Sequence, residues 1–204
     1  MQVTPTFIVE AACQVLRQGA VFYENNSSRE DLKQALVDFD RQHYTVDLSS
    51  DQFMVVTCGG TQAILLTMLS VLSPRDDMIN VTPNWPNFTE AARIAGAVVH
   101  DVALRFVPER SVFQLDFDRL HAVLSAAGSP RVIVVNSSSN PNGRVMTTRQ
   151  QQPLYELCIQ HDLILLSDEM YDRIVFYVLA RPAHWTRSTT SIAIARFAIS
   201  STTN

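Results

Sequence analysis

Residues 163–171 read LILLSDEMY and residues 132–143 read VIVVNSSSNPNG, so each stretch joins a short apolar run to a polar segment. Short apolar runs are typical of strands that are buried on both faces of a parallel sheet. In an open sheet between helices, ligands bind outside the carboxyl ends of the strands. The two stretches therefore predict neighbouring strand ends that deliver Asn140, Asp168 and Tyr171 to a flat, anionic cofactor with a ring nitrogen.

The rest of the chain alternates in the same way between strand-like and helix-like segments. Strands are expected at residues 53–57, 78–82, 97–102, 131–136 and 162–167, with a further one around Ile192 and Ile194. Helices are expected at residues 60–72, 86–95, 116–126 and 147–161, after two amino-terminal helices that begin near Thr4 and Ser28. This alternation predicts a three-layer α/β/α fold with a mainly parallel sheet.

Composition excludes several classes of protein. A content of 47% hydrophobic and 18% charged residues fits a globular chain, and its 204 residues suffice for one real core. The net charge of −4 offers no basic surface for nucleic acid, and no apolar run approaches the ~20 residues that span a membrane. The first residues do not resemble a secretion signal.

The cysteines and histidines indicate neither disulfides nor a metal. Cys13, Cys58 and Cys158 are far apart and form no CxxC pair, so we expect three reduced, mostly buried thiols in a cytoplasmic protein. The five histidines show no ligand spacing, so no metal site is expected.

Two further motifs lie upstream in a strand-to-loop context. Residues 56–64 read VTCGGTQAI and residues 83–88 read PNWPNF. Together with the first two motifs, and in the same order, they resemble the pyridoxal-phosphate aminotransferases of class I/II, the aspartate aminotransferase superfamily. The resemblance runs from about residue 4 to about residue 177. It implies that residues 1–177 are part of the large domain of the pyridoxal-phosphate transferase fold, with residues 178–204 as an atypical tail.

The resemblance also implies pyridoxal 5'-phosphate as cofactor and a role for each motif. A strand-to-helix turn with small residues suits a phosphate, since helix N-termini bind anions. Asp168 is expected to pair with the pyridine nitrogen, and Asn140 and Tyr171 to bond the ring hydroxyl. Trp85 is expected to stack on the ring. The expected cofactor-binding residues are Gly60, Thr61, Gln62, Trp85, Asn140, Asp168 and Tyr171.

Each of these residues also has a structural interpretation. Gly60 and Thr61 suit an ordinary tight turn, and Asp168 suits the cap of a strand end. Asn140 precedes a proline and would start a turn, whereas Trp85 and Tyr171 would serve as core aromatics. Glu169 is expected to be structural, and Arg144 and Arg173 to form surface ion pairs.

The chain holds a single lysine, Lys33, expected on the solvated face of an amphipathic helix. The resemblance implies a Schiff-base lysine in a Ser-x-Lys segment near residues 197–204, where the sequence has no lysine. No catalytic residue is therefore assigned. The family's small carboxy-terminal domain also has no counterpart, so the chain is expected to be truncated.

The resemblance implies an aminotransferase that, in full-length form, moves an amino group from an amino acid to a 2-oxo acid, with a homodimer as the expected assembly. One alternative is a lyase or decarboxylase that uses the same cofactor site. Another is a non-catalytic relative that binds only the cofactor or a partner chain, which the missing lysine favours. A nucleotide-binding domain is a weaker alternative, because the turn at Gly59 and Gly60 lacks the GxGxxG spacing.

Overall fold

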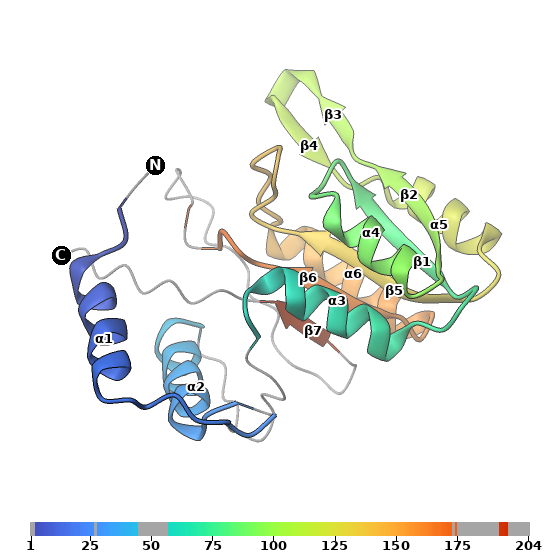
Figure 1. Ribbon diagram of the computed structural model, residues 1–204. Coiled ribbons are helices and arrows are strands. Elements are labelled where there is room, and N and C mark those ends of the chain that lie inside the picture. Colours follow the sequence, from blue (N-terminus) through green and yellow to red (C-terminus); the bar gives the residue numbers. More distant parts are fainter. Residues whose placement is uncertain (1–2, 27, 45–56, 173, 175–191, 196–204) are drawn as a thin grey trace.

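The computed structural model describes residues 3–26, 28–44, 57–172, 174 and 192–195 (Figure 1). The predicted strand at residues 53–57 lies almost wholly outside the described residues. Arg173 and most of the predicted tail lie outside them as well.

The described residues form six α-helices and seven strands. The helices are α1 (Thr6–Arg17), α2 (Glu30–Tyr44), α3 (Gly60–Val71), α4 (Asn87–Ile94), α5 (Phe117–Ala126) and α6 (Thr148–Gln160). The strands are β1 (Asp77–Thr82), β2 (Val98–Ala103), β3 (Arg105–Val107), β4 (Val112–Gln114), β5 (Pro130–Asn136), β6 (Ile164–Asp168) and β7 (Ile192–Ala195). Every helix and strand predicted within the described residues is confirmed to within a few positions.

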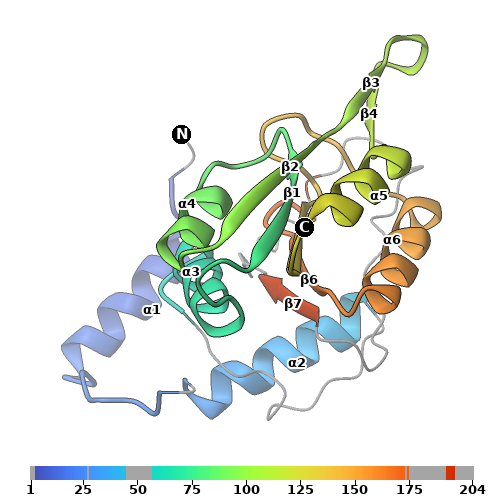
Figure 2. The same cartoon turned by 90° about the vertical axis from the view of Figure 1, so that its right-hand side faces the viewer.

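Five strands form one parallel sheet in the order β2-β1-β5-β6-β7. Side chains alternate across it: Met78 enters a core with α3 and α4, whereas Ile79 and Val81 enter a core with α5 and α6. Figure 2 shows these two helix pairs on opposite sides of the sheet. The predicted three-layer α/β/α class is confirmed, and β7 carries the sheet into the segment beyond residue 177.

The strand order places a switch point between β1 and β5. The chain runs from β1 through α4 to its neighbour β2, then returns to place β5 on the other side of β1. Crossovers that leave β1 in opposite directions open a crevice at the carboxyl ends of the two strands, where open α/β sheets bind ligands. The loops after β1 and β5 border this crevice.

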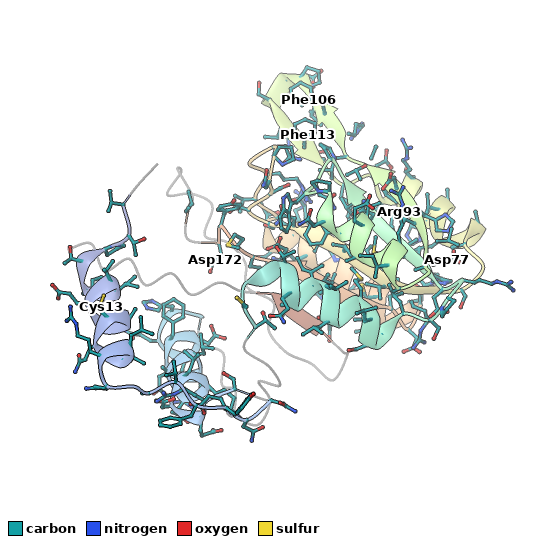
Figure 3. All side chains as sticks on the ribbon, in the orientation of Figure 1. Cys13, Asp77, Arg93, Phe106, Phe113 and Asp172 are labelled. Atoms are coloured by element: carbon teal, nitrogen blue, oxygen red, sulfur yellow. The ribbon has the colours of Figure 1, made fainter. Side chains whose placement is uncertain are left out.

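The hairpin of β3 and β4 was not predicted. Phe106 and Phe113 pair across it with ring centroids 5.1 Å apart, and the hairpin projects beyond the sheet (Figures 1 and 3). Strands of three residues are too short to give a clear period-two pattern, which explains why the sequence did not reveal them.

Helix α1 has no buried residue, although it is rich in apolar side chains. Phe7 and Leu16 are largely exposed, as are Phe22 and Tyr23 in the segment that follows. In Figure 1, α1 lies well apart from the sheet. An apolar surface of this kind is typical of a site of protein contact.

The expected position of Lys33 was wrong. Lys33 is only 7% exposed, and its Nζ lies 2.7 Å from Glu30 Oε2. Lys33, Val37 and Asp40 lie at helical spacing and are all buried, so α2 buries this face and leaves Leu32 41% exposed. The apolar residues of this segment, Leu32 among them, predicted a buried face of α2 that is offset by about one residue from the face that is buried in the structure.

The cysteines were also partly misplaced. Of the three free thiols only Cys158 is buried; Cys58 is exposed and Cys13 is intermediate. Cys158 packs between α6 and the sheet, and burial raises the pKa of its thiol to about 12. Cys58 lies in the loop before α3, where no core covers it.

Candidate cofactor site

The loops on the two sides of the switch point are joined by a hydrogen bond. Asn142, in the loop after β5, donates its Nδ2 to the carbonyl oxygen of Pro83, in the loop after β1, at 3.3 Å. Their bond ties the loop after β1 to the loop after β5. The segment after β1 carries Trp85, and the segment after β5 carries Asn140.

The end of β5 is tied closely to the end of β6. Ser137 N–H and Asn136 Nδ2 both donate to the carbonyl oxygen of Asp168, each at 3.0 Å. Asn136 Oδ1 accepts the backbone N–H of Asn140 at 2.6 Å. Asn136 therefore links two of the predicted site residues, Asn140 and Asp168, across adjacent strands.

The carboxylate of Asp168 is buried and only partly satisfied. The residue is 8% exposed, and its Oδ1 accepts the backbone N–H of Met170 at 3.0 Å. Burial raises the pKa of Asp168 to about 6; the Met170 N–H opposes this shift and the charge of Glu169 adds to it. Within the described residues no cationic side chain forms an ion pair with this carboxylate.

Helix α3 brings its amino end to the same edge of the sheet. Its 12 residues extend about 18 Å at 1.5 Å per residue, and it ends shortly before β1 starts at the amino edge. The first turn of α3 therefore lies near the carboxyl ends of the strands. Its exposed N–H groups and positive dipole end suit an anion.

The turn before α3 depends on a glycine. Gly59 is the N-cap with φ of 91°, a conformation that side chains disfavour. Thr57 Oγ1 donates to Gly59 O and Gln62 Oε1 accepts Cys58 N–H, each at 2.7 Å. The amide oxygen of Gln62 thus braces the turn, whereas Thr61 is exposed at the helix start.

The two predicted aromatic residues differ in their packing. Trp85 is half-buried and meets Phe88 edge to face, with ring centroids 6.2 Å apart and planes at 85°. It also packs against the core below α3 and α4. Tyr171 follows β6 and is 39% exposed, so it is more accessible to solvent than the half-buried Trp85.

Arg144 does not form the expected surface ion pair. It is 7% exposed, and its Nε and Nη2 have no hydrogen-bond partner among the residues described. Burial lowers the pKa of its guanidinium to about 10. The loop folds back through Ser139 N–H to Arg144 O and Arg144 N–H to Asn142 Oδ1, which turns Arg144 into the interior.

Sequence reasoning gave no role to the two residues that tie the loops of the site together, Asn136 and Asn142, although both belong to the quoted motif at residues 132–143. In the described part of the chain, no group of three or more potential ligands could hold a metal ion. None of the helices described is long and apolar enough to cross a membrane.

Comparison with known proteins gives the same family for most of the chain. The family model described as "Aminotransferase class I and II" matches residues 1–199. The aspartate/prephenate aminotransferase of Thermus thermophilus is 31% identical over 173 residues, which are 85% of this chain and 43% of that protein. A probable N-succinyldiaminopimelate aminotransferase of Mycobacterium tuberculosis is 27% identical, over 84% of this chain and 42% of that protein. The chain thus spans about two fifths of the length of these relatives.

Solved structures agree with this assignment. A mutant of Thermus thermophilus aspartate aminotransferase superposes with a TM-score of 0.77 at 30% identity, covering 86% of this chain and 47% of that one. An aromatic aminotransferase from Pyrococcus horikoshii gives a TM-score of 0.83 at 22% identity, covering 95% and 51%, which supports the fold alone. The chain belongs to the class I and II aminotransferases.

Proposed function

We propose that this chain binds pyridoxal 5'-phosphate in the crevice between β1 and β5. In the whole protein this site would serve the transfer of an amino group from an amino acid to a 2-oxo acid. The observation that carries the proposal is Asp168, a buried carboxylate without a cationic partner among the described residues, at the carboxyl end of β6 beside β5. When bound, the cofactor supplies an electron-accepting pyridine ring.

Asp168 is the proposed partner of the pyridine nitrogen. A protonated ring nitrogen would give this carboxylate the cation that it lacks, so its pKa would fall from the value raised by burial. The ion pair would keep the ring protonated at neutral pH. The carbonyl bonds to Asn136 and Ser137 hold the Asp168 backbone in position.

The first turn of α3 is the proposed phosphate site. Gly60 and the Gly59 turn let an anion approach the backbone N–H groups, and Thr61 adds an exposed hydroxyl donor. Gln62 contributes by bracing the turn and through its remaining amide nitrogen.

Asn140, Tyr171 and Trp85 are the proposed contacts of the ring. Asn140 is fixed to β5 through Asn136, so its amide is available to the ring hydroxyl beside Asp168. Tyr171, which is more exposed, would approach the same hydroxyl. Trp85 would stack on the ring face, a contact worth roughly 0.5–1.5 kcal/mol between aromatic groups.

A second candidate function is that of a relative that binds the cofactor without a covalent bond to Lys33, the only lysine of the given sequence. Lys33 lies on α2, and its ammonium group is paired with Glu30 at 2.7 Å. This ion pair supports binding of the cofactor without a bond to Lys33. A lyase or decarboxylase reaction would use the same ring site, and only product analysis separates it from amino transfer.

The proposed assembly is a homodimer, with an amino acid and a 2-oxo acid as small-molecule partners. The exposed apolar side chains of α1 support the dimer, since they lack a core to cover them. Light scattering on the eluting protein tests it: a mass of twice 22.9 kDa is expected. The domain boundary at residue 177 and the cytoplasmic location remain predictions.

Titration of the purified chain with pyridoxal 5'-phosphate, followed by borohydride reduction and intact mass measurement, tests the cofactor proposal. Saturable binding without a reduced adduct is the expected result. The Asp168→Ala variant should lose most of that binding, whereas Asp118→Ala, at an exposed position on α5, serves as the control. Equal affinity of all three proteins would refute the site, and a stoichiometric adduct on Lys33 would refute the role given to that residue.

A further inference from the structure

Strand β1 buries an amide where its neighbours are apolar. Asn80 is 1% exposed and lies between Ile79 and Val81 in a strand that is buried along nearly its whole length. A polar group in such a place costs free energy unless its hydrogen bonds are made. The partners of Asn80 therefore show what the amide is held for.

All the polar atoms of the Asn80 side chain have partners. Its Nδ2 donates to Thr89 Oγ1 on α4 at 3.2 Å and to Asp101 Oδ1 on β2 at 2.8 Å. Its Oδ1 accepts Nδ2 of Asn84 at 2.5 Å. Asp101 lies directly opposite Asn80 in the parallel register, so the two strands fix the orientation of the amide.

The bond to Asn84 connects this network to the crevice. Asn84 immediately precedes Trp85, and Pro83 before it accepts the bond from Asn142 on the other side of the switch point. The loop that carries Trp85 is thus held by two side chains: Asn80 bonds Asn84, and Asn142 bonds the carbonyl oxygen of Pro83. Trp85 itself leans edge to face on Phe88, the residue before Thr89.

We propose that Asn80 is a positioning residue, which acts through Asn84 to hold the Trp85 ring in the orientation in which it would stack on the cofactor. This inference rests on the proposed cofactor site. An apolar side chain would serve the core at position 80 as well as its neighbours do. The fully bonded amide of Asn80 instead fixes the loop. A Trp85 side chain that is already fixed loses less conformational entropy when a ring stacks on it.

A double-mutant cycle between Asn80→Val and Asn84→Ala tests the proposal. The affinity for pyridoxal 5'-phosphate is measured for both single variants, the double variant and the parent. The chain has two tryptophans, so a Trp185→Phe background makes Trp85 the single fluorescent reporter. Asn87→Ala, the same substitution three residues further on and outside the network, is the matched control.

Each single variant should bind the cofactor roughly 2- to 12-fold more weakly, the range expected if the stacking contact is lost. The double variant should be no weaker than the weaker single variant, because both break one connection. Without cofactor, the fluorescence anisotropy of Trp85 should fall in both variants and stay at the parent value in Asn87→Ala. A purely structural role would lower the melting temperature without this change in Trp85.

The proposal is overturned if Asn84→Ala matches Asn87→Ala in both cofactor affinity and Trp85 anisotropy. Asn84 lies in a partly buried loop, so this variant decides the question even where Asn80→Val does not fold. If the parent protein binds no cofactor, the proposed function fails. The anisotropy measurement still shows whether Asn80 holds the loop.

Discussion

The two ends of the same parallel sheet each bury an aspartate, and the two carboxylates lie in opposite environments. Asp77 begins β1 at the amino edge, and Asp168 ends β6 at the carboxyl edge. Both are less than 10% exposed. In Figure 3 the labelled Asp77 and Asp172, which follows β6, lie at opposite ends of the sheet.

Asp77 is satisfied by its surroundings. Its Oδ2 accepts Ser129 N–H and its Oδ1 lies beside His100 Nε2, each at 2.7 Å. Burial raises the pKa of Asp77, but the Ser129 N–H and His100 outweigh it, so the pKa is lowered overall. The pKa of Asp168 is instead raised to about 6. Two buried carboxylates of one sheet thus differ in whether the protein supplies a charge-stabilising partner, and the one without a cationic partner is the one proposed to bind the cofactor.

Loss of the Asp77 carboxylate should cause the largest loss of stability among the variants considered. Asp77→Ala leaves Ser129 N–H and His100 without their partner, so the free energy of unfolding should fall by about 3 kcal/mol. Urea denaturation at pH 7 measures it. Asp118→Ala, at an exposed position on α5, should change it by less than about 0.5 kcal/mol. Equal effects would mean that Asp77 is not an anchor of the amino edge.

Asp168→Asn should instead raise the free energy of unfolding. The folded pKa of about 6 exceeds the ordinary 3.8, so ionisation destabilises the fold increasingly from pH 4 to 6 and fully above that range. The variant should therefore gain roughly 2–3 kcal/mol of stability at pH 8 and nothing at pH 3.5, since the shift is worth about 3 kcal/mol at most. It should also lose affinity for the cofactor. Asp162→Asn, at an exposed site, should show neither change; a gain independent of pH would contradict the assignment.

The guanidinium of Arg144 tests the same difference between buried charges with and without a partner. Arg144 has no counter-charge among the described residues, so Arg144→Met should raise the free energy of unfolding by about 1.5 kcal/mol, because an unpaired buried cation is replaced by an apolar side chain. The midpoint of urea unfolding measures the gain. Arg110→Met, at an exposed turn, is the control. A destabilised Arg144 variant would show that the guanidinium has a partner in the folded protein.

The smallest effect is expected at His100. His100→Phe keeps a ring but removes one of the two bonds to Asp77, which should cost about 1 kcal/mol at pH 7. The lowered pKa of Asp77 stabilises the fold above pH 3.8, and this contribution is lost as the pH falls through the folded pKa. Without His100 that pKa should rise, so acid unfolding should begin at a higher pH. An unchanged acid midpoint would assign the effect to Ser129 alone.

The sequence pointed to Asp168 and overlooked Asp77, although both flank apolar strands. Asp168 lies in a recognisable motif, whereas the partners of Asp77 are His100 and Ser129, which lie 23 and 52 residues away. Distances of that kind leave no local pattern. The same reason hid the Asn80 network, whose partner Asp101 belongs to the next strand.

By itself, the sequence determined the succession of strands and helices, the α/β class and the motifs at residues 56–64, 83–88, 136–143 and 167–171. These follow from local periodicity, turn residues and short motifs, which each stretch of chain carries on its own. Only the tertiary structure decided that Lys33 and Arg144 are buried, that Asp168 has no cationic partner among the described residues and that Asn142 reaches Pro83. Burial and hydrogen-bond partners depend on which segments become neighbours in the sheet. Those neighbours are defined only when the strands have paired and the helices have packed on both faces of the sheet.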